Sequence, residues 1–86
     1  MHRLFPVPTE DNLTLELISE LEDATETSIT IFNAQGQRML NREVTLNKGF
    51  NQVSLNVQAL NVGNYFINVI SKGEVLTTQR FTKIGF

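Results

Sequence analysis

The chain has 86 residues, no cysteine and a formal net charge of −2. Its length suits a single domain, and without cysteine it can form neither a disulfide nor a thiolate site. The negative net charge argues against a nucleic-acid binder that depends on phosphate contacts, and no apolar run approaches the ~20 residues of a membrane helix.

The charges are distributed unevenly along the chain. Residues 1–26 carry one basic and seven acidic side chains and sum to −6, whereas residues 27–86 sum to +4. If the N-terminal third packs beside later strands, this polarity is neutralised within the fold. Otherwise the C-terminal part presents a mildly basic face.

The N-terminal segments predict an extended start followed by a strand. Phe5–Pro8 contains two prolines, which remove two hydrogen-bond donors, so we expect an edge segment there rather than a central strand. Leu13–Leu17 alternates leucine with polar residues, as a strand with one wet face does. Leu13–Glu26 is also rich in helix formers, but leucines two positions apart do not share one helical face. We therefore expect a strand, followed by an acidic loop over Glu20–Thr27.

The next segment, Ser28–Asn33, is rich in β-branched residues and predicts a second strand. Ile29 and Ile31 share one face of this strand. Phe32 lies on the other face, where it sits either under a loop or in a second apolar surface.

Two more strands follow, separated by short turns. Gly36 is the residue that can hold the left-handed position of a hairpin loop, and Gln37–Leu46 returns as a strand. Arg42 interrupts the apolar row of that strand, which suggests a bulge or a sheet edge. Asn47–Gly49 is predicted to form a second hairpin turn before the alternating strand Gln52–Val57.

A sharp corner is predicted before the strand Asn64–Ser71. Asn61 and Gly63 can take the positive φ that such a corner needs. Tyr65 follows at once, and in Greek-key sandwiches a tyrosine so placed buries its ring while its hydroxyl reaches back to the main chain. We therefore predict a tyrosine corner, with an ordinary turn as the alternative.

The chain closes with a tight turn at Lys72 and Gly73 and a last strand, Val75–Lys83, in which Phe81 is the expected core residue. Turn signals recur about every 8–12 residues, as in β-sandwiches. The sequence thus predicts an all-β, Greek-key sandwich of about seven antiparallel strands, one of which lies near Phe5–Pro8.

Candidates for catalysis or metal binding are few. The single histidine, His2, lies at the terminus and is expected to be a spectator. Serines lack a histidine partner, and every glycine stands alone in a turn, so no phosphate-binding loop is predicted. Glu20, Glu22, Asp23 and Glu26 do not have the spacing of an EF-hand and are expected to form a solvated loop. We expect no enzyme, no metal and no cofactor.

The aromatic residues are spaced as strand residues and are expected to lie mostly in the core. This set comprises Phe32, Phe50, Tyr65, Phe66 and Phe81. Phe50, at a turn, and Phe86, at the end, are the better candidates for exposed apolar contacts.

Several motifs resemble the C-terminal sorting domain (type A) of cargo proteins of the type IX (Por) secretion system of Bacteroidetes. Their order and spacing span almost the whole chain. Phe5–Pro8 is similar to the aromatic-Pro-Asn-Pro opening of that family, and Ile29–Gln37 to its Val-x-Ile-Tyr-Asn-x-x-Gly segment. Leu60–Phe66 is similar to Leu-x-x-Gly-x-Tyr-Phe, and Arg80–Lys83 to the closing Lys-Phe-Val-Lys.

The resemblance implies an immunoglobulin-like sandwich fused behind a cargo domain. It implies a non-catalytic secretion signal that the translocon reads, which carries the cargo from the periplasm across the outer membrane to the cell surface or beyond. A sortase-like protease then removes the domain. We expect residues 1–4 to be a linker remnant and 5–86 the sorting domain, within a longer exported precursor because the chain begins without a signal peptide.

The surface that the translocon reads is hypothesised to be the edge of the last hairpin, with the basic side chains of Arg80 and Lys83, because an exposed edge is a template for strand addition. Such an edge also permits a dimer. The alternative function is an immunoglobulin-like adhesion or carbohydrate-binding module. The candidate recognition residues are Gly63, Tyr65, Phe66, Arg80, Phe81 and Lys83, and the structural motif residues are Pro6, Pro8, Gly36 and Gly73.

Overall fold

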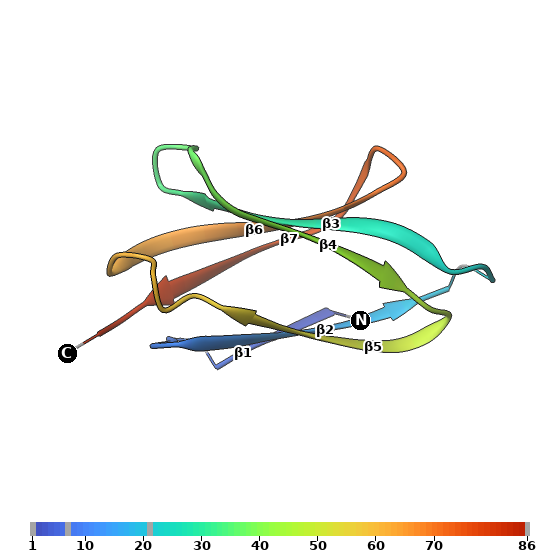
Figure 1. The fold of residues 1–86 in the computed structure, drawn as a ribbon, viewed down its shortest axis with the longest axis horizontal. Coiled ribbons are helices and arrows are strands. Elements are labelled where there is room, and N and C mark those ends of the chain that lie inside the picture. The colour runs from blue at the N-terminus through green and yellow to red at the C-terminus, as the bar shows by residue number, and fades with distance from the viewer. Residues whose placement is uncertain (1, 7, 21, 86) are drawn as a thin grey trace.

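The computed structural model describes residues 2–6, 8–20 and 22–85. They form seven strands: β1 (His2–Phe5), β2 (Asn12–Ser19), β3 (Thr25–Asn33), β4 (Arg38–Leu46), β5 (Gly49–Asn56), β6 (Gly63–Ser71) and β7 (Glu74–Lys83). A three-stranded sheet, in the order β1-β2-β5, lies against a four-stranded sheet, in the order β4-β3-β6-β7 (Figure 1). The predicted all-β sandwich is therefore confirmed.

The core lies between the two sheets and is built by residues that alternate along the strands. In β2 the leucines at positions 13, 15 and 17 are at most 1% exposed, so the strand prediction for this segment is confirmed over the helical alternative. Alternation places every second side chain on the inner face, and burial of that face drives the sheets together. The buried cluster is Leu13, Leu15, Leu17, Ile29, Ile31, Leu46, Val53, Leu55, Val57, Tyr65, Ile67, Val69 and Phe81.

Two predicted turns are confirmed by their backbone angles. Gly36 has φ of 84° in the β3–β4 loop, where its amide donates to the Asn33 carbonyl at 3.0 Å. Lys72 and Gly73 have φ of 53° and 77°, the paired positive angles that suit the right-handed twist of a two-residue hairpin.

The hairpin predicted at Asn47–Gly49 is wrong. β4 lies in the four-stranded sheet, whereas β5 pairs with β2 in the other sheet, so this segment crosses between the layers. The Asn51 side chain braces the crossing, since it accepts from the Asn47 amide at 2.9 Å and donates to the Asn47 carbonyl at 2.8 Å. The same turn residues suit a hairpin and a crossing between sheets. Which of the two forms depends on the strand with which β5 can pair.

The first strand lies earlier than expected. It spans His2–Phe5 and pairs with β2 from His2 opposite Leu17 to Phe5 opposite Thr14, so residues 2–4 belong to the sheet rather than to a linker. It ends where the prolines begin, because Pro6 and Pro8 have no amide proton to donate. The acidic loop is also shorter than expected, since β3 begins at Thr25.

Arg42 lies in β4, an edge strand of the four-stranded sheet. Of the two alternatives predicted for it, a bulge or a sheet edge, the edge is therefore confirmed. Its guanidinium donates to the Ser54 carbonyl at 2.5 Å and so links β4 to β5 across the side of the sandwich. The irregularity of pairing lies instead between Ile31 and Phe32 of β3, which oppose Leu40 and Arg38.

Candidate functional site

The tyrosine corner forms as predicted at the start of β6. The Tyr65 hydroxyl donates to the Asn61 carbonyl at 2.6 Å, while the ring is only 4% exposed. Gly63, at the corner, has the positive φ expected there, 157°, which residues with a side chain rarely adopt, whereas Asn61 has no positive φ. The aromatic ring thus fills part of the core while the hydroxyl binds a carbonyl of the preceding loop. The two contacts together fix where the chain enters β6, a central strand.

Tyr65 supports the last strand directly. It lies opposite Phe81 of β7, and the two rings stack with centroids 5.5 Å apart and an interplanar angle of 18°. Phe81 is 1% exposed. Tyr65 and Phe81, both candidate recognition residues, therefore lie inside the sandwich and hold β7 in place from its inner face.

The edge of β7 is partly covered by the segment that leads into β2. The Thr9 amide donates to the Thr82 carbonyl at 2.9 Å, and the Ile84 amide donates to the Thr9 carbonyl at 2.8 Å. This short parallel bridge closes the C-terminal end of the edge. Nothing in the local sequence predicts it, because Thr9 and its partners lie at opposite ends of the chain.

The same bridge shows which main-chain groups of β7 point away from β6. In a strand the amide and carbonyl of one residue point to the same side and those of its neighbour to the other. Because Thr82 points outward and pairing with β6 is regular from Thr82 to Thr78, the groups of Arg80 and Thr78 also point outward. This part of the edge lies beyond the Thr9 bridge.

Lys83 does not present its charge at this edge, contrary to the hypothesis. Its side chain is on the inner parity with Phe81 and the residue is 5% exposed. The ammonium donates to the Ile84 carbonyl at 3.1 Å. Arg80, by contrast, is exposed on the outer face, so the two basic residues point to opposite sides of the strand.

Phe66 is also not a core residue. It is 39% exposed on the outer face of β6, directly opposite Arg80. Phe32 is half-buried and lies opposite Phe66 from β3. The second of the two arrangements considered for Phe32, an outer apolar surface, is therefore the one that forms.

The opening motif lies between β1 and the Thr9 bridge. Phe5 and Pro6 are joined by a cis peptide bond. Pro6 and Pro8 are exposed and flank Val7, which lies outside the described residues, as does Phe86. Pro8 immediately precedes Thr9, so this motif connects β1 of the three-stranded sheet to the β7 edge of the four-stranded sheet.

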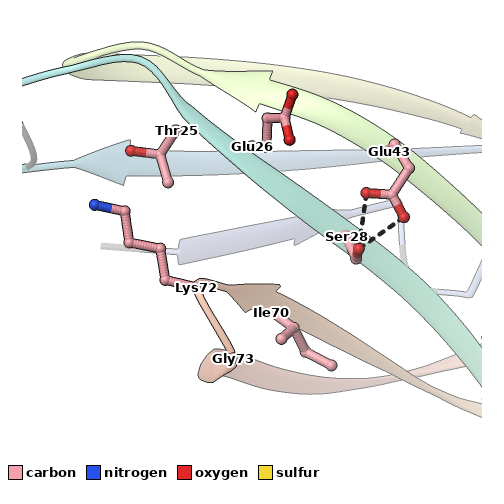
Figure 2. Close-up of a pocket in the computed structure, with 7 residues that line it drawn as sticks. All are labelled: Thr25, Glu26, Ser28, Glu43, Ile70, Lys72 and Gly73. Carbon is pink, nitrogen blue, oxygen red and sulfur yellow. Dashed lines mark hydrogen bonds between the residues drawn. The ribbon is translucent and has the colours of Figure 1, made fainter.

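A hollow of about 500 Å³ lies at the opposite end of the four-stranded sheet, over β3, β4 and the β6–β7 turn (Figure 2). The Ser28 hydroxyl bridges both carboxylate oxygens of Glu43, at 2.7 and 2.8 Å. This bond, together with one from Asn41, lowers the pKa of Glu43. A carboxylate stabilised in this way is a weaker base, which makes it a poor activator of the serine that it holds.

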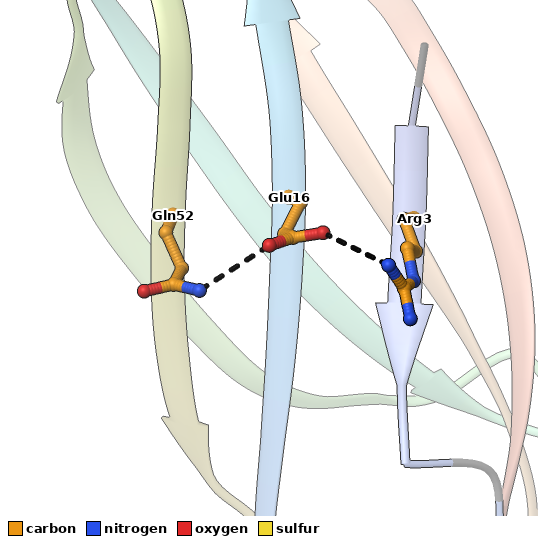
Figure 3. Close-up of polar contacts among 3 residues, drawn as sticks. All are labelled: Arg3, Glu16 and Gln52. Carbon is orange, nitrogen blue, oxygen red and sulfur yellow. Dashed lines mark hydrogen bonds and ion pairs between the residues drawn. The ribbon is translucent and has the colours of Figure 1, made fainter.

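The outer face of the three-stranded sheet carries a polar row and an apolar pair. Glu16 of β2 contacts Arg3 of β1 at 3.9 Å and accepts from Gln52 of β5 at 3.3 Å (Figure 3). Beside this row, Ile18 lies opposite Phe50. Phe50 is 63% exposed, as expected for an exposed apolar contact.

Within the described part of the chain, no group of three or more metal-ligating side chains comes together. The acidic loop instead contributes an ion pair, from Glu22 to Lys48 at 2.7 Å. The described residues also contain no helix of the length and apolarity needed to cross a membrane.

Comparison of the fold with solved structures supports the immunoglobulin-like architecture. A crystal structure of an immunoglobulin-like protein from Pseudomonas aeruginosa superposes with a TM-score of 0.60 and 13% sequence identity, over 96% of this chain and 89% of that one. At this identity the likeness concerns the fold alone.

Comparison of the sequence with curated proteins gives no match. The model of a protein family described as the secretion system C-terminal sorting domain matches residues 3–83. That span runs from the middle of β1 to the last residue of β7 and includes the tyrosine corner and the partly covered edge. The chain therefore belongs to the family of C-terminal sorting domains of the type IX (Por) secretion system.

Proposed function

We propose that this domain is a non-catalytic address label that the type IX translocon reads on a folded surface. The observation that carries the proposal is the match of the sorting-domain family to residues 3–83, which is the whole sandwich rather than a short tail. In this proposal the domain passes through the periplasm behind a fused cargo. A sortase-like protease cleaves on its N-terminal side, upstream of β1, after the outer membrane has been crossed.

The surface proposed for recognition is the part of the β7 edge that Thr9 leaves uncovered. Thr78 and Arg80 direct main-chain donors and acceptors outward there, and a strand of the translocon could pair with them. Gly63, Tyr65, Phe81 and Lys83 would then act indirectly, by fixing the position of β7. A second copy of the chain could pair with the same groups and form an edge dimer.

An export assay tests this function. The complete chain is fused behind a fluorescent protein with a signal peptide and expressed in a Bacteroidetes host with and without the translocon. We expect surface or extracellular fluorescence only when both translocon and domain are present. Export that does not require the translocon would refute the proposal.

A pair of substitutions at one position tests the edge. Thr78→Pro removes an outward amide proton, whereas Thr78→Ala keeps it and loses only the 2.8 Å bond from the side chain to Asn68. We expect export to fall at least about tenfold with proline and to persist with alanine. Both purified variants must retain a cooperative thermal transition, and equal export by the two would rule out pairing at this edge.

The adhesion or carbohydrate-binding alternative has one specific feature in its favour, the exposed Ile18–Phe50 pair beside a small apolar hollow. Aromatic side chains in such positions can stack on sugar rings. Glycan binding by the isolated domain that disappears in Phe50→Ser would support this alternative. The absence of glycan binding by the isolated parent domain would rule this alternative out.

A further inference from the structure

The outer face of the four-stranded sheet carries one row of residues that differs from all its neighbours. Strand pairing places Arg38 of β4 opposite Phe32 of β3, Phe32 opposite Phe66 of β6, and Phe66 opposite Arg80 of β7. Two aromatic side chains thus lie at the centre of the sheet, with an arginine at each edge. We call these four residues the Arg-Phe-Phe-Arg row.

The adjacent row is polar and already paired. The Thr30 hydroxyl donates to Asn41 at 2.8 Å, and the Thr78 hydroxyl donates to Asn68 at 2.8 Å. The same pattern recurs at the corner end of the sheet, where Thr82 donates to Asn64 at 3.0 Å. Cross-strand pairs of this kind stabilise a sheet without leaving its hydroxyl protons available to a ligand.

The two arginines of the row, unlike most cationic side chains of the chain, have no partner among the described residues. Arg3 contacts Glu16, Arg42 donates to Ser54, Lys48 pairs with Glu22, and Lys83 donates to Ile84. No such hydrogen bond or ion pair involves Arg38 or Arg80 within the described part of the chain. Their guanidinium groups are exposed and remain available for charge-assisted hydrogen bonds.

The centre of the row is apolar and accessible. Phe66 is 39% exposed, and Met39, which the irregular pairing of β4 places beside the row, is 42% exposed. Aromatic residues and arginine are the side chains most enriched at protein interfaces, whereas surface lysine and glutamate are depleted. A charge-flanked aromatic centre therefore has the composition of a docking surface.

We propose that the Arg-Phe-Phe-Arg row binds an acidic polypeptide segment of the secretion machinery, one with an aliphatic side chain between two carboxylates. The proposal rests on the proposed sorting function, since a partner must read the label. Three strand spacings of ~4.8 Å separate the arginines by ~14 Å. An extended segment laid across the strands covers this distance between residues i and i+4, at ~3.3 Å per residue. A glycan is disfavoured because the hydroxyls bordering the row already donate to asparagine side chains.

Binding to a defined peptide tests the proposal on the isolated domain. The probe is a labelled, N-acetylated peptide with two glutamates four positions apart and a leucine midway, and the matched probe has glutamine at both positions. The variants are Arg38→Gln/Arg80→Gln and, as control, Lys72→Asn. The control removes Lys72, a cation in the β6–β7 turn that pairs with none of the described side chains, and replaces it with a residue that tolerates its φ of 53°.

We expect amide shifts in ¹⁵N spectra to localise to the row on addition of the acidic peptide, with affinity at least about fivefold weaker for the glutamine probe and for the double arginine variant. Lys72→Asn should bind like the parent, and added salt should weaken binding. Equal binding of both probes, no binding at millimolar peptide, or displacement of the peptide by a phosphorylated oligosaccharide would overturn the proposal. Native-like spectra of the variants exclude unfolding.

The export assay separates this inference from the function on which it rests. If the parent fusion is not exported, the sorting function itself fails. If the parent is exported and Arg38→Gln/Arg80→Gln is exported equally well, the sorting function stands and the row is not what the machinery reads. Export lost in the double variant but kept in Lys72→Asn is the expected result.

Discussion

Tyr65 and Phe81 lie opposite each other on β6 and β7, and their rings stack within the core 5.5 Å apart. The Tyr65 hydroxyl at the same time donates to the Asn61 carbonyl. One residue therefore joins the corner that starts β6 to the strand whose edge is proposed for recognition.

Two substitutions separate the polar from the apolar part of this pair. Tyr65→Phe removes the hydrogen bond from the buried tyrosine to the Asn61 carbonyl, so we expect a loss of about 1 kcal/mol in the free energy of unfolding. Phe81→Ala leaves a cavity and should cost about 3–5 kcal/mol. Urea denaturation at constant m-value measures both. Equal losses in the two variants would contradict the assignment of Phe81 as the main apolar anchor.

Lys83→Met is expected to maintain or increase stability. Lys83 is buried, and among the described residues its ammonium has one hydrogen-bond acceptor, the Ile84 carbonyl at 3.1 Å. Removing a charge from water is unfavourable unless it is fully compensated. Methionine preserves the length of the apolar part of the chain. Thermal denaturation gives the result, and Lys83→Ala, which also removes packing, serves as the comparison. A large destabilisation by methionine would mean that the ammonium itself holds the end of β7.

The Ser28–Glu43 contact predicts a pH dependence. The pKa of Glu43 is lowered by the hydrogen bond from Ser28 and, to a smaller degree, by that from Asn41. A carboxyl group whose pKa is lower in the folded state stabilises the fold above its unfolded pKa, and this contribution is lost as pH falls through the folded value. Carboxyl ¹³C titration of Glu43 should give a midpoint below the ordinary glutamate range.

Ser28→Ala is the matched variant for this titration. We expect it to move the midpoint of Glu43 upward and to make the stability of the domain less sensitive to acid. An unchanged midpoint would show that the serine bond is not maintained in solution. Asn41→Ala should have a smaller effect, because its bond is longer, at 3.1 Å.

Alanine substitutions at two glycines, Gly73 in the β6–β7 turn and Gly85 after β7, are expected to differ in their effect on stability. Gly73 has φ of 77°, which a side chain adopts only at a cost, so Gly73→Ala should destabilise the domain by about 1 kcal/mol. Gly85 has no such angle, and a Cβ there would make ordinary contact with Val62 at 3.6 Å. Gly85→Ala is therefore expected to be close to neutral in the same thermal denaturation experiment.

The sequence alone determined the strands, most of the turns and the tyrosine corner, because these depend on alternation and on local turn chemistry that a linear pattern displays. Tertiary structure decided what depends on pairing between distant segments. It placed Asn47–Gly49 between the sheets rather than in a hairpin, and it closed the end of the β7 edge with Thr9. It also turned Lys83 inward and brought Arg38, Phe32, Phe66 and Arg80 into one row. Strand register and sheet order arise from burial summed over the whole core, and no short stretch of sequence contains that sum.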